Sequence, residues 1–229
     1  MKYSLCFFPW IGAVIGALSL GWRALCIKTG MPELPAVLIL CALPLIVTGG
    51  FHADGYMDTM DALHSYRPAE EKLRILKDPH IGAFSVIMLL LYYMIYIAAA
   101  DLVYRAPGQN TFSICCCGFF LSRALSGLGI LFIRPAKEDG MLRTFADTAD
   151  RLRVRNALIL QAVAAAALML YLSPLCAAAV LTAATGSFLY YRYRALREFG
   201  GITGDTAGWF LMICECCMAV AAALYSLAA

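Results

Sequence analysis

The chain has 229 residues, of which 62% are hydrophobic and only 14% are charged, a balance outside the usual range of soluble domains. The composition therefore indicates a membrane protein and excludes an ordinary water-soluble domain. The formal net charge is +3, and no basic stripe with interleaved aromatic residues occurs, so nucleic acid is not an expected partner.

Seven stretches are apolar over roughly the length that a helix needs to cross a bilayer core of ~30 Å. They are residues 4–22, 35–51, 82–100, 111–133, 156–172, 174–191 and 209–228. The first stretch lacks a small-residue cleavage site followed by a polar domain, so we expect it to be retained as a span and not removed as a signal peptide. The sequence thus predicts an all-α fold, a polytopic bundle of about seven transmembrane helices that forms one catalytic domain over residues 1–229.

The Lys and Arg residues are distributed unevenly between the loops of such a bundle. Most of the 18 fall near the N-terminus and in the predicted loops 52–81, 134–155 and 192–208, which share one side of the membrane. Because cytoplasmic loops are enriched in Lys and Arg, this side is predicted to face the cytoplasm. We expect a multi-pass protein of the bacterial or archaeal cytoplasmic membrane, surrounded by lipid.

Three aspartates follow the second predicted span, in GGFHADGYMDTMD (residues 49–61). Asp54, Asp58 and Asp61 are spaced i, i+4, i+7, so on a helix they fall within about 60° of one another. Like charges on one face repel unless a cation lies between them, and oxygen ligands suit a hard ion such as Mg²⁺. The spacing predicts a Mg²⁺ site; the alternative is a solvated loop helix that is acidic without a metal.

Cationic residues come next along the chain. Arg74 and Lys77 precede Asp78 and the helix-breaking segment PHIG. A phosphate or diphosphate needs such cations, because a metal ion cannot neutralise all of its oxygens. The competing interpretation of Arg74 and Lys77 is the ordinary positive flank of a cytoplasmic loop.

Three further ionisable residues stand in or beside apolar spans. Arg123 lies well inside FLSRALSGLG and should face a polar cavity or a partner, and we favour a functional role over a structural salt bridge. Glu215 lies inside the last span and also needs a partner or a wet cavity. Asp205 lies in the glycine-rich GGITGDTAG, which alone is a weak signal because glycine also ends helices.

These segments resemble a known family. GGFHADGYMDTMDAL, LKDPHIGAF, LSRAL, AKEDGM and GGITGDTAG occur in the order and approximate spacing seen in cobalamin 5'-phosphate synthase, also called adenosylcobinamide-GDP ribazoletransferase. The resemblance covers nearly the whole chain. It implies a multi-spanning inner-membrane enzyme that joins adenosylcobinamide-GDP to α-ribazole or its 5'-phosphate, releases GMP and requires Mg²⁺. A homo-oligomer is compatible with it.

The resemblance also implies roles for the polar residues in a transfer that depends on alignment and charge neutralisation. One or two Mg²⁺ ions would be held by Asp54, Asp58 and Asp61. Substrate phosphates would be bound by Arg74, Lys77, His80, Arg123 and Lys137. The acceptor of the hydroxyl proton stays open between His52, Asp78 and Asp205.

The sequence departs from the family pattern at two places. Ala62 stands where glycine is common after the third aspartate, and Pro79-His80 stands where Ser-Arg is common. The second departure weakens the transfer of a phosphate-binding role from that arginine to His80. The three aspartate positions are intact.

Two other kinds of protein remain open on sequence grounds. A Mg²⁺-dependent prenyltransferase would have a second DxxxD, and a CDP-alcohol phosphotransferase would have Ala-Arg within its DG motif; neither is found here. A cation transporter would carry ionisable residues in the middle of several spans, whereas nearly all the acids here fall in predicted loops.

Overall fold

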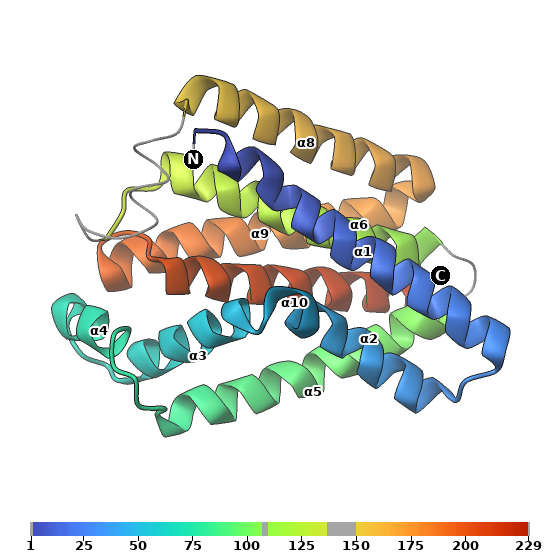
Figure 1. Ribbon diagram of the computed structural model, residues 1–229, viewed down its shortest axis with the longest axis horizontal. Coiled ribbons are helices and arrows are strands. Elements are labelled where there is room, and N and C mark those ends of the chain that lie inside the picture. Colours follow the sequence, from blue (N-terminus) through green and yellow to red (C-terminus); the bar gives the residue numbers. More distant parts are fainter. Residues whose placement is uncertain (1, 107–109, 137–149, 229) are drawn as a thin grey trace.

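The computed structural model describes residues 2–106, 110–136 and 150–228, and nearly all of them are helical (Figure 1). The helices are α1 Ser4–Thr29, α2 Glu33–Thr48, α3 Phe51–His64, α4 Ala69–Ile75, α5 Ala83–Arg105, α6 Asn110–Phe132, α8 Arg151–Leu172, α9 Pro174–Phe199 and α10 Gly204–Ala228. Over these ranges the only β pairing is an isolated bridge between Pro135 and Ile202. The predicted all-α membrane bundle is confirmed.

Six helices in this part of the chain are each long and apolar enough to cross a membrane, namely α1, α5, α6, α8, α9 and α10. The predicted span 35–51 is different. α2 ends at Thr48 and α3 follows at 92° to it. Neither helix alone is long and apolar enough to cross a membrane, and only the two together would make a seventh span. The predicted connection over 52–81 begins with a helix, α3, as the spacing of its aspartates indicates, but this helix packs within the bundle.

Two consecutive glycines make the break between α2 and α3. Gly49 and Gly50 have φ of 63° and 77°, a left-handed conformation that residues with a Cβ atom rarely adopt. The N–H of Gly50 donates to the carbonyl of Leu45 and closes the end of α2. The acidic segment that follows is consequently part of the bundle and not a solvated loop.

The helices lie roughly side by side along the long axis of the molecule, with α8 at one edge and α5 at the other (Figure 1). α1 begins at the end of the bundle where α3, α6 and α9 end, and α10 finishes at the opposite end. The start of α1 and the ends of α3, α6 and α9 thus share one end, which is the arrangement expected from seven crossings.

Small residues allow close helix packing, as is common in membranes. A Cβ added to Gly12 of α1 would lie 2.1 Å from the carbonyl oxygen of Phe119 in α6, and one added to Gly16 would lie 2.7 Å from that of Cys116. The acidic helix α3 packs against α5 and α10. Of these partners, α10 comes from a distant part of the chain.

Candidate active site

The N-terminal half of α3 lies in backbone contact with the start of α10. A Cβ added to Gly55 would lie 2.9 Å from both the Cα and the carbonyl oxygen of Asp205, and one added to Gly208 would lie 3.2 Å from the carbonyl oxygen of His52. Only glycine permits such an approach without displacement of backbone. The structure thereby joins the segments HADG and GDTAG, which the sequence places about 150 residues apart.

The first turn of α10 is fixed by a reciprocal cap. The N–H of Thr206 donates to Oγ1 of Thr203 at 3.1 Å, and the N–H of Thr203 donates to Oγ1 of Thr206 at 2.8 Å. This is the capping-box pattern, here with threonine at both positions. It holds Asp205 in the first helical turn, where the helix dipole favours a negative charge.

Carboxylates from both helices gather at this junction. Asp58 is half-buried and lies within electrostatic range of Asp54, Asp61 and Asp205. Such a group of like charges is repulsive unless a cation lies among them. We refer to Asp54, Asp58 and Asp205 as the acidic cluster.

Asp61 has a structural partner that the sequence does not reveal. Its two carboxylate oxygens accept the N–H groups of Gly82 and Ser85, each at 2.8 Å, and so cap the start of α5. In the described ranges, no three His, Cys, Asp or Glu residues form a group that could hold a metal ion. The predicted Mg²⁺ ligands Asp54, Asp58 and Asp61 do not form such a group in the structure, and Asp61 also caps α5; their role in binding Mg²⁺ stays a prediction.

Mg²⁺ commonly takes one or two carboxylates and completes its shell with water and phosphate oxygens. Asp54 and Asp58, one helical turn apart on α3, supply that kind of donor set without Asp61. The residues present therefore fit this ion, and Mg²⁺ binding itself stays a prediction.

The predicted cationic residues lie around the exposed connection between α4 and α5. Arg74 pairs with Glu70 at 3.1 Å, and Lys77 is exposed. The ring of His80 contacts the carboxylate of Asp78 at 2.6 Å, and hydrogen bonds from the His80 backbone and side chain lower the pKa of Asp78. Asp78 is consequently a weak proton acceptor. Lys137 lies outside the described residues.

This connection is held to the bundle at both sides. Asp61 binds its last residue, Gly82, while the buried Lys72 of α4 donates to Glu198 near the end of α9. The exposed cations Arg74 and Lys77 are thus carried on a segment that is fastened to α3 and α9.

Arg123 has a partner inside the bundle. Its Nη1 lies 2.6 Å from Oε1 of Glu215, with side-chain exposures of 0% and 8%, and Oγ of Ser122 donates to the same oxygen at 2.9 Å. This ion pair engages Nη1 of Arg123, whereas its buried Nε and Nη2 have no hydrogen-bond partner among the described residues, so the binding of substrate phosphate by Arg123 stays a prediction. Both residues are recognisable from the sequence as charges in apolar spans, but their pairing is not.

His52 lines a cavity of about 640 Å³ between α1, the α2–α3 break, α6 and α10. Its ring makes edge contacts with those of Phe8 and Phe51, with centroids 6.2 Å and 6.3 Å apart. Of the described residues that line this cavity, His52 is the only one with an ionisable side chain. The cavity is therefore an apolar compartment beside the acidic cluster.

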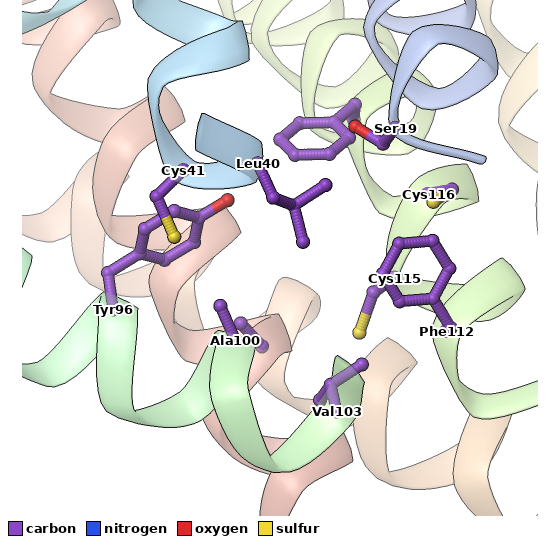
Figure 2. Close-up of a pocket in the computed structure, with 11 residues that line it drawn as sticks. Ser19, Leu40, Cys41, Tyr96, Ala100, Val103, Phe112, Cys115 and Cys116 are labelled. Atoms are coloured by element: carbon purple, nitrogen blue, oxygen red, sulfur yellow. The ribbon is translucent and has the colours of Figure 1, made fainter. Parts of the chain in front are cut away.

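A second cavity, of about 40 Å³, lies between α1, α2, α5, α6 and α10 (Figure 2). The thiol groups of Cys41, Cys115 and Cys116 and the hydroxyl groups of Ser19 and Tyr96 line it, together with apolar side chains. It is far smaller than the ~300–1,000 Å³ of typical ligand sites. We do not regard it as a substrate site.

A family model described as Cobalamin-5-phosphate synthase matches residues 1–223. The chain belongs to this family. It is 36% identical over 215 residues to an adenosylcobinamide-GDP ribazoletransferase of Lachnoclostridium phytofermentans, a match that covers 94% of this chain and 81% of that protein. Proteins of the same name from Pseudomonas syringae pv. syringae and Clostridium perfringens strain 13 are 33% and 30% identical, over 96% and 93% of this chain and 88% and 84% of theirs. No solved structure matches.

Membership of the cobalamin-5-phosphate synthase family removes the alternatives left open by the sequence. The prenyltransferase, CDP-alcohol phosphotransferase and transporter interpretations rested only on acidic residues near a membrane span. Within the family match, the junction of α3 and α10 is where the structure concentrates carboxylates.

Proposed function

We propose that this chain is a membrane-bound adenosylcobinamide-GDP ribazoletransferase, with its reaction centre at the junction of α3 and α10. The family match over residues 1–223 supports the activity. The proposed location rests on the backbone contact between Gly55 and Asp205, which brings carboxylates from two helices together. The substrates are adenosylcobinamide-GDP and α-ribazole or its 5'-phosphate.

In this reaction, an oxygen of the acceptor forms a bond to the phosphorus on the corrinoid side of the diphosphate. The bond from that phosphorus to the bridging oxygen breaks, and GMP leaves with the bridging oxygen as a phosphate monoester. Such a transfer needs positioning and charge stabilisation more than covalent catalysis. When bound, Mg²⁺ would neutralise part of the charge on the diphosphate oxygens. Asp54 and Asp58 would hold it.

The chain's own cations would supply the remaining positive charge. Arg74 and Lys77 are exposed on the segment that Asp61 fastens to α3, and His80 lies in the same segment. We assign them to the phosphates of GDP, where ion pairs and charge-assisted hydrogen bonds would orient the leaving group. Arg74 would exchange its exposed contact with Glu70 for phosphate.

Asp205 is our choice for the acceptor of the hydroxyl proton among the three candidates. Its position in the first turn of α10, in contact with Gly55, places it beside Asp58. Asp78 is held as a weakly basic anion by His80, and His52 lies in an apolar cavity. A base next to the bound diphosphate satisfies the requirement that it reach the attacking oxygen.

The reaction centre is proposed to face the cytoplasm. The end of the bundle where α1 begins and α3 ends carries most of the Lys and Arg residues, as the positive-inside rule requires of a cytoplasmic face. This orientation would give the site access to nucleotide substrates made in the cytosol.

The proposed activity is tested with purified protein in detergent. Incubation with adenosylcobinamide-GDP, α-ribazole and Mg²⁺ should yield GMP and a complete corrinoid, measured by mass spectrometry. Asp58→Asn should lower the rate by roughly 10²-fold or more, whereas the matched change Asp101→Asn, in an ion pair with Arg105 near the far end of α5, should not. Absence of GMP from the wild-type reaction would refute the assignment.

A further inference from the structure

The 640 Å³ cavity beside His52 is not used by the diphosphate chemistry proposed above, yet it adjoins the acidic cluster on two helices. On α3, Phe51 lines the cavity, and Asp54 and Asp58 follow it at i+3 and i+7 on the same helical face. On α10, Gly204 lines the cavity and Asp205 is the next residue. Asp54, Asp58 and Asp205 do not line the cavity, but a molecule that extends from it along α3 would reach Asp54 after about one helical turn.

The lining of this cavity is suited to a flat aromatic group. The rings of Phe7, Phe8, Phe51 and His52 line it, together with the small residues Ala207 and Gly208 of α10. Aromatic rings bind other rings through edge-to-face or offset contacts, and small residues leave room for a planar group. Polar side chains in the lining are few, namely His52 and the hydroxyl residues Ser4, Thr48 and Ser126.

Three ring systems of the substrates could occupy the cavity: guanine, the corrin and the benzimidazole base of α-ribazole. Their hydrogen-bonding groups decide which of them fits its lining. Guanine carries donors and acceptors along several edges, and a corrin ring carries many carboxamides, so each would leave polar groups without partners in this lining. The benzimidazole base of α-ribazole, once joined to ribose, has one ring nitrogen as its sole hydrogen-bond acceptor. One donor, from His52 or Ser126, would satisfy it.

We propose that this cavity binds the benzimidazole base of the acceptor nucleoside, with its ribose directed toward Gly204 and Asp205. The proposal rests on the ribazoletransferase activity proposed above and adds to it the place and the chemistry of acceptor recognition. It also gives a reason for the α2–α3 break, which brings Phe51 and His52 to the cavity at the start of the acidic helix.

The test introduces a larger side chain on α10, which would occupy part of the cavity. Ala207→Leu should raise the KM for α-ribazole at least tenfold, while the dissociation constant for adenosylcobinamide-GDP and the kcat at saturating acceptor stay within twofold of wild type. The matched control is Ala17→Leu, an identical change in a separate apolar cavity lined by α1, α6 and α8, and it should change neither value. The free base 5,6-dimethylbenzimidazole should inhibit the wild type competitively against α-ribazole and inhibit Ala207→Leu less strongly.

A second variant covers the case in which Ala207→Leu does not fold. Phe51 is 65% exposed, so Phe51→Ala leaves the packed interior intact. It should also raise the KM for α-ribazole without weakening the binding of adenosylcobinamide-GDP.

The outcomes separate the two proposals. Wild type that makes no GMP refutes the activity itself. Wild type that makes GMP, together with variants whose KM for α-ribazole is unchanged, refutes only the assignment of the cavity and leaves a lipid chain as its occupant. A loss of adenosylcobinamide-GDP binding in folded variants would instead assign the cavity to the donor, and would also overturn the proposal.

Discussion

Gly55 of α3 lies against the backbone of Asp205 in α10, so closely that a Cβ on Gly55 would be 2.9 Å from the Asp205 Cα. This contact makes one site from two segments that are far apart in the sequence. It also explains why Gly55 and Gly208 accompany the aspartates, because a larger residue at either position would press against the backbone of the other helix.

Gly55→Ala should lower turnover by about 10²-fold, since a displacement of about 1 Å between α3 and α10 would misplace the groups that position the diphosphate. The protein should still insert and fold. GMP release is the measurement, with Gly186→Ala as the control, because an added Cβ there meets nothing within 4 Å. Retention of more than half the wild-type rate in Gly55→Ala would argue against the proposed junction.

Asp61→Ala should lower the free energy of unfolding by about 0.5–2 kcal/mol through loss of the cap on α5. The Mg²⁺ concentration that gives half-maximal activity should stay unchanged, because Asp54 and Asp58 remain. Thermal unfolding in detergent and a Mg²⁺ titration of activity measure the two effects. A strongly raised Mg²⁺ requirement with unchanged stability would instead indicate that Asp61 is a ligand of the metal ion.

Arg123→Met or Glu215→Leu should each destabilise the fold by about 3–5 kcal/mol, because each leaves one buried charge without its partner. The double variant should regain most of the stability and near-normal KM for adenosylcobinamide-GDP. Unfolding in detergent and steady-state kinetics provide the comparison. A folded double variant with a greatly increased KM for adenosylcobinamide-GDP would mean that Arg123 does bind substrate.

A cysteine at Ser65, just after α3, should react with an impermeant maleimide only from the cytoplasmic side. The background should carry Cys217→Ser, because Cys217 is the exposed cysteine among the described residues. Inverted and right-side-out vesicles allow the comparison. Labelling of Ser65→Cys in intact cells would overturn the proposed orientation.

The spans were largely predictable because hydropathy depends on composition, and six predicted spans correspond to single helices. The packing of α3 was not predictable, because its charges indicate a helix in a solvated connection. The structure instead packs this helix on α5 and α10. Gly49-Gly50 reads as an ordinary helix end, and the left-handed φ values that turn the chain by 92° are known only from the structure.

The site was predictable in its residue types more than in their partners. Asp54 and Asp58 were identified from helical spacing, and the structure brings Asp205 to them from a segment whose signal was weak alone. The bonds of Asp61 to α5 and the pairing of Arg123 with Glu215 depend on long-range packing, which spacing along one chain segment cannot indicate.

In the proposed mechanism, the acidic cluster binds a diphosphate only together with a cation. Titration calorimetry of adenosylcobinamide-GDP into the purified protein tests this directly, in EDTA and in millimolar Mg²⁺. We predict that Mg²⁺ tightens binding by roughly 5–150-fold in the wild type and much less in Asp58→Asn, since each ligand should raise the affinity for the other. Equal affinities of the wild type in the two buffers would contradict the account.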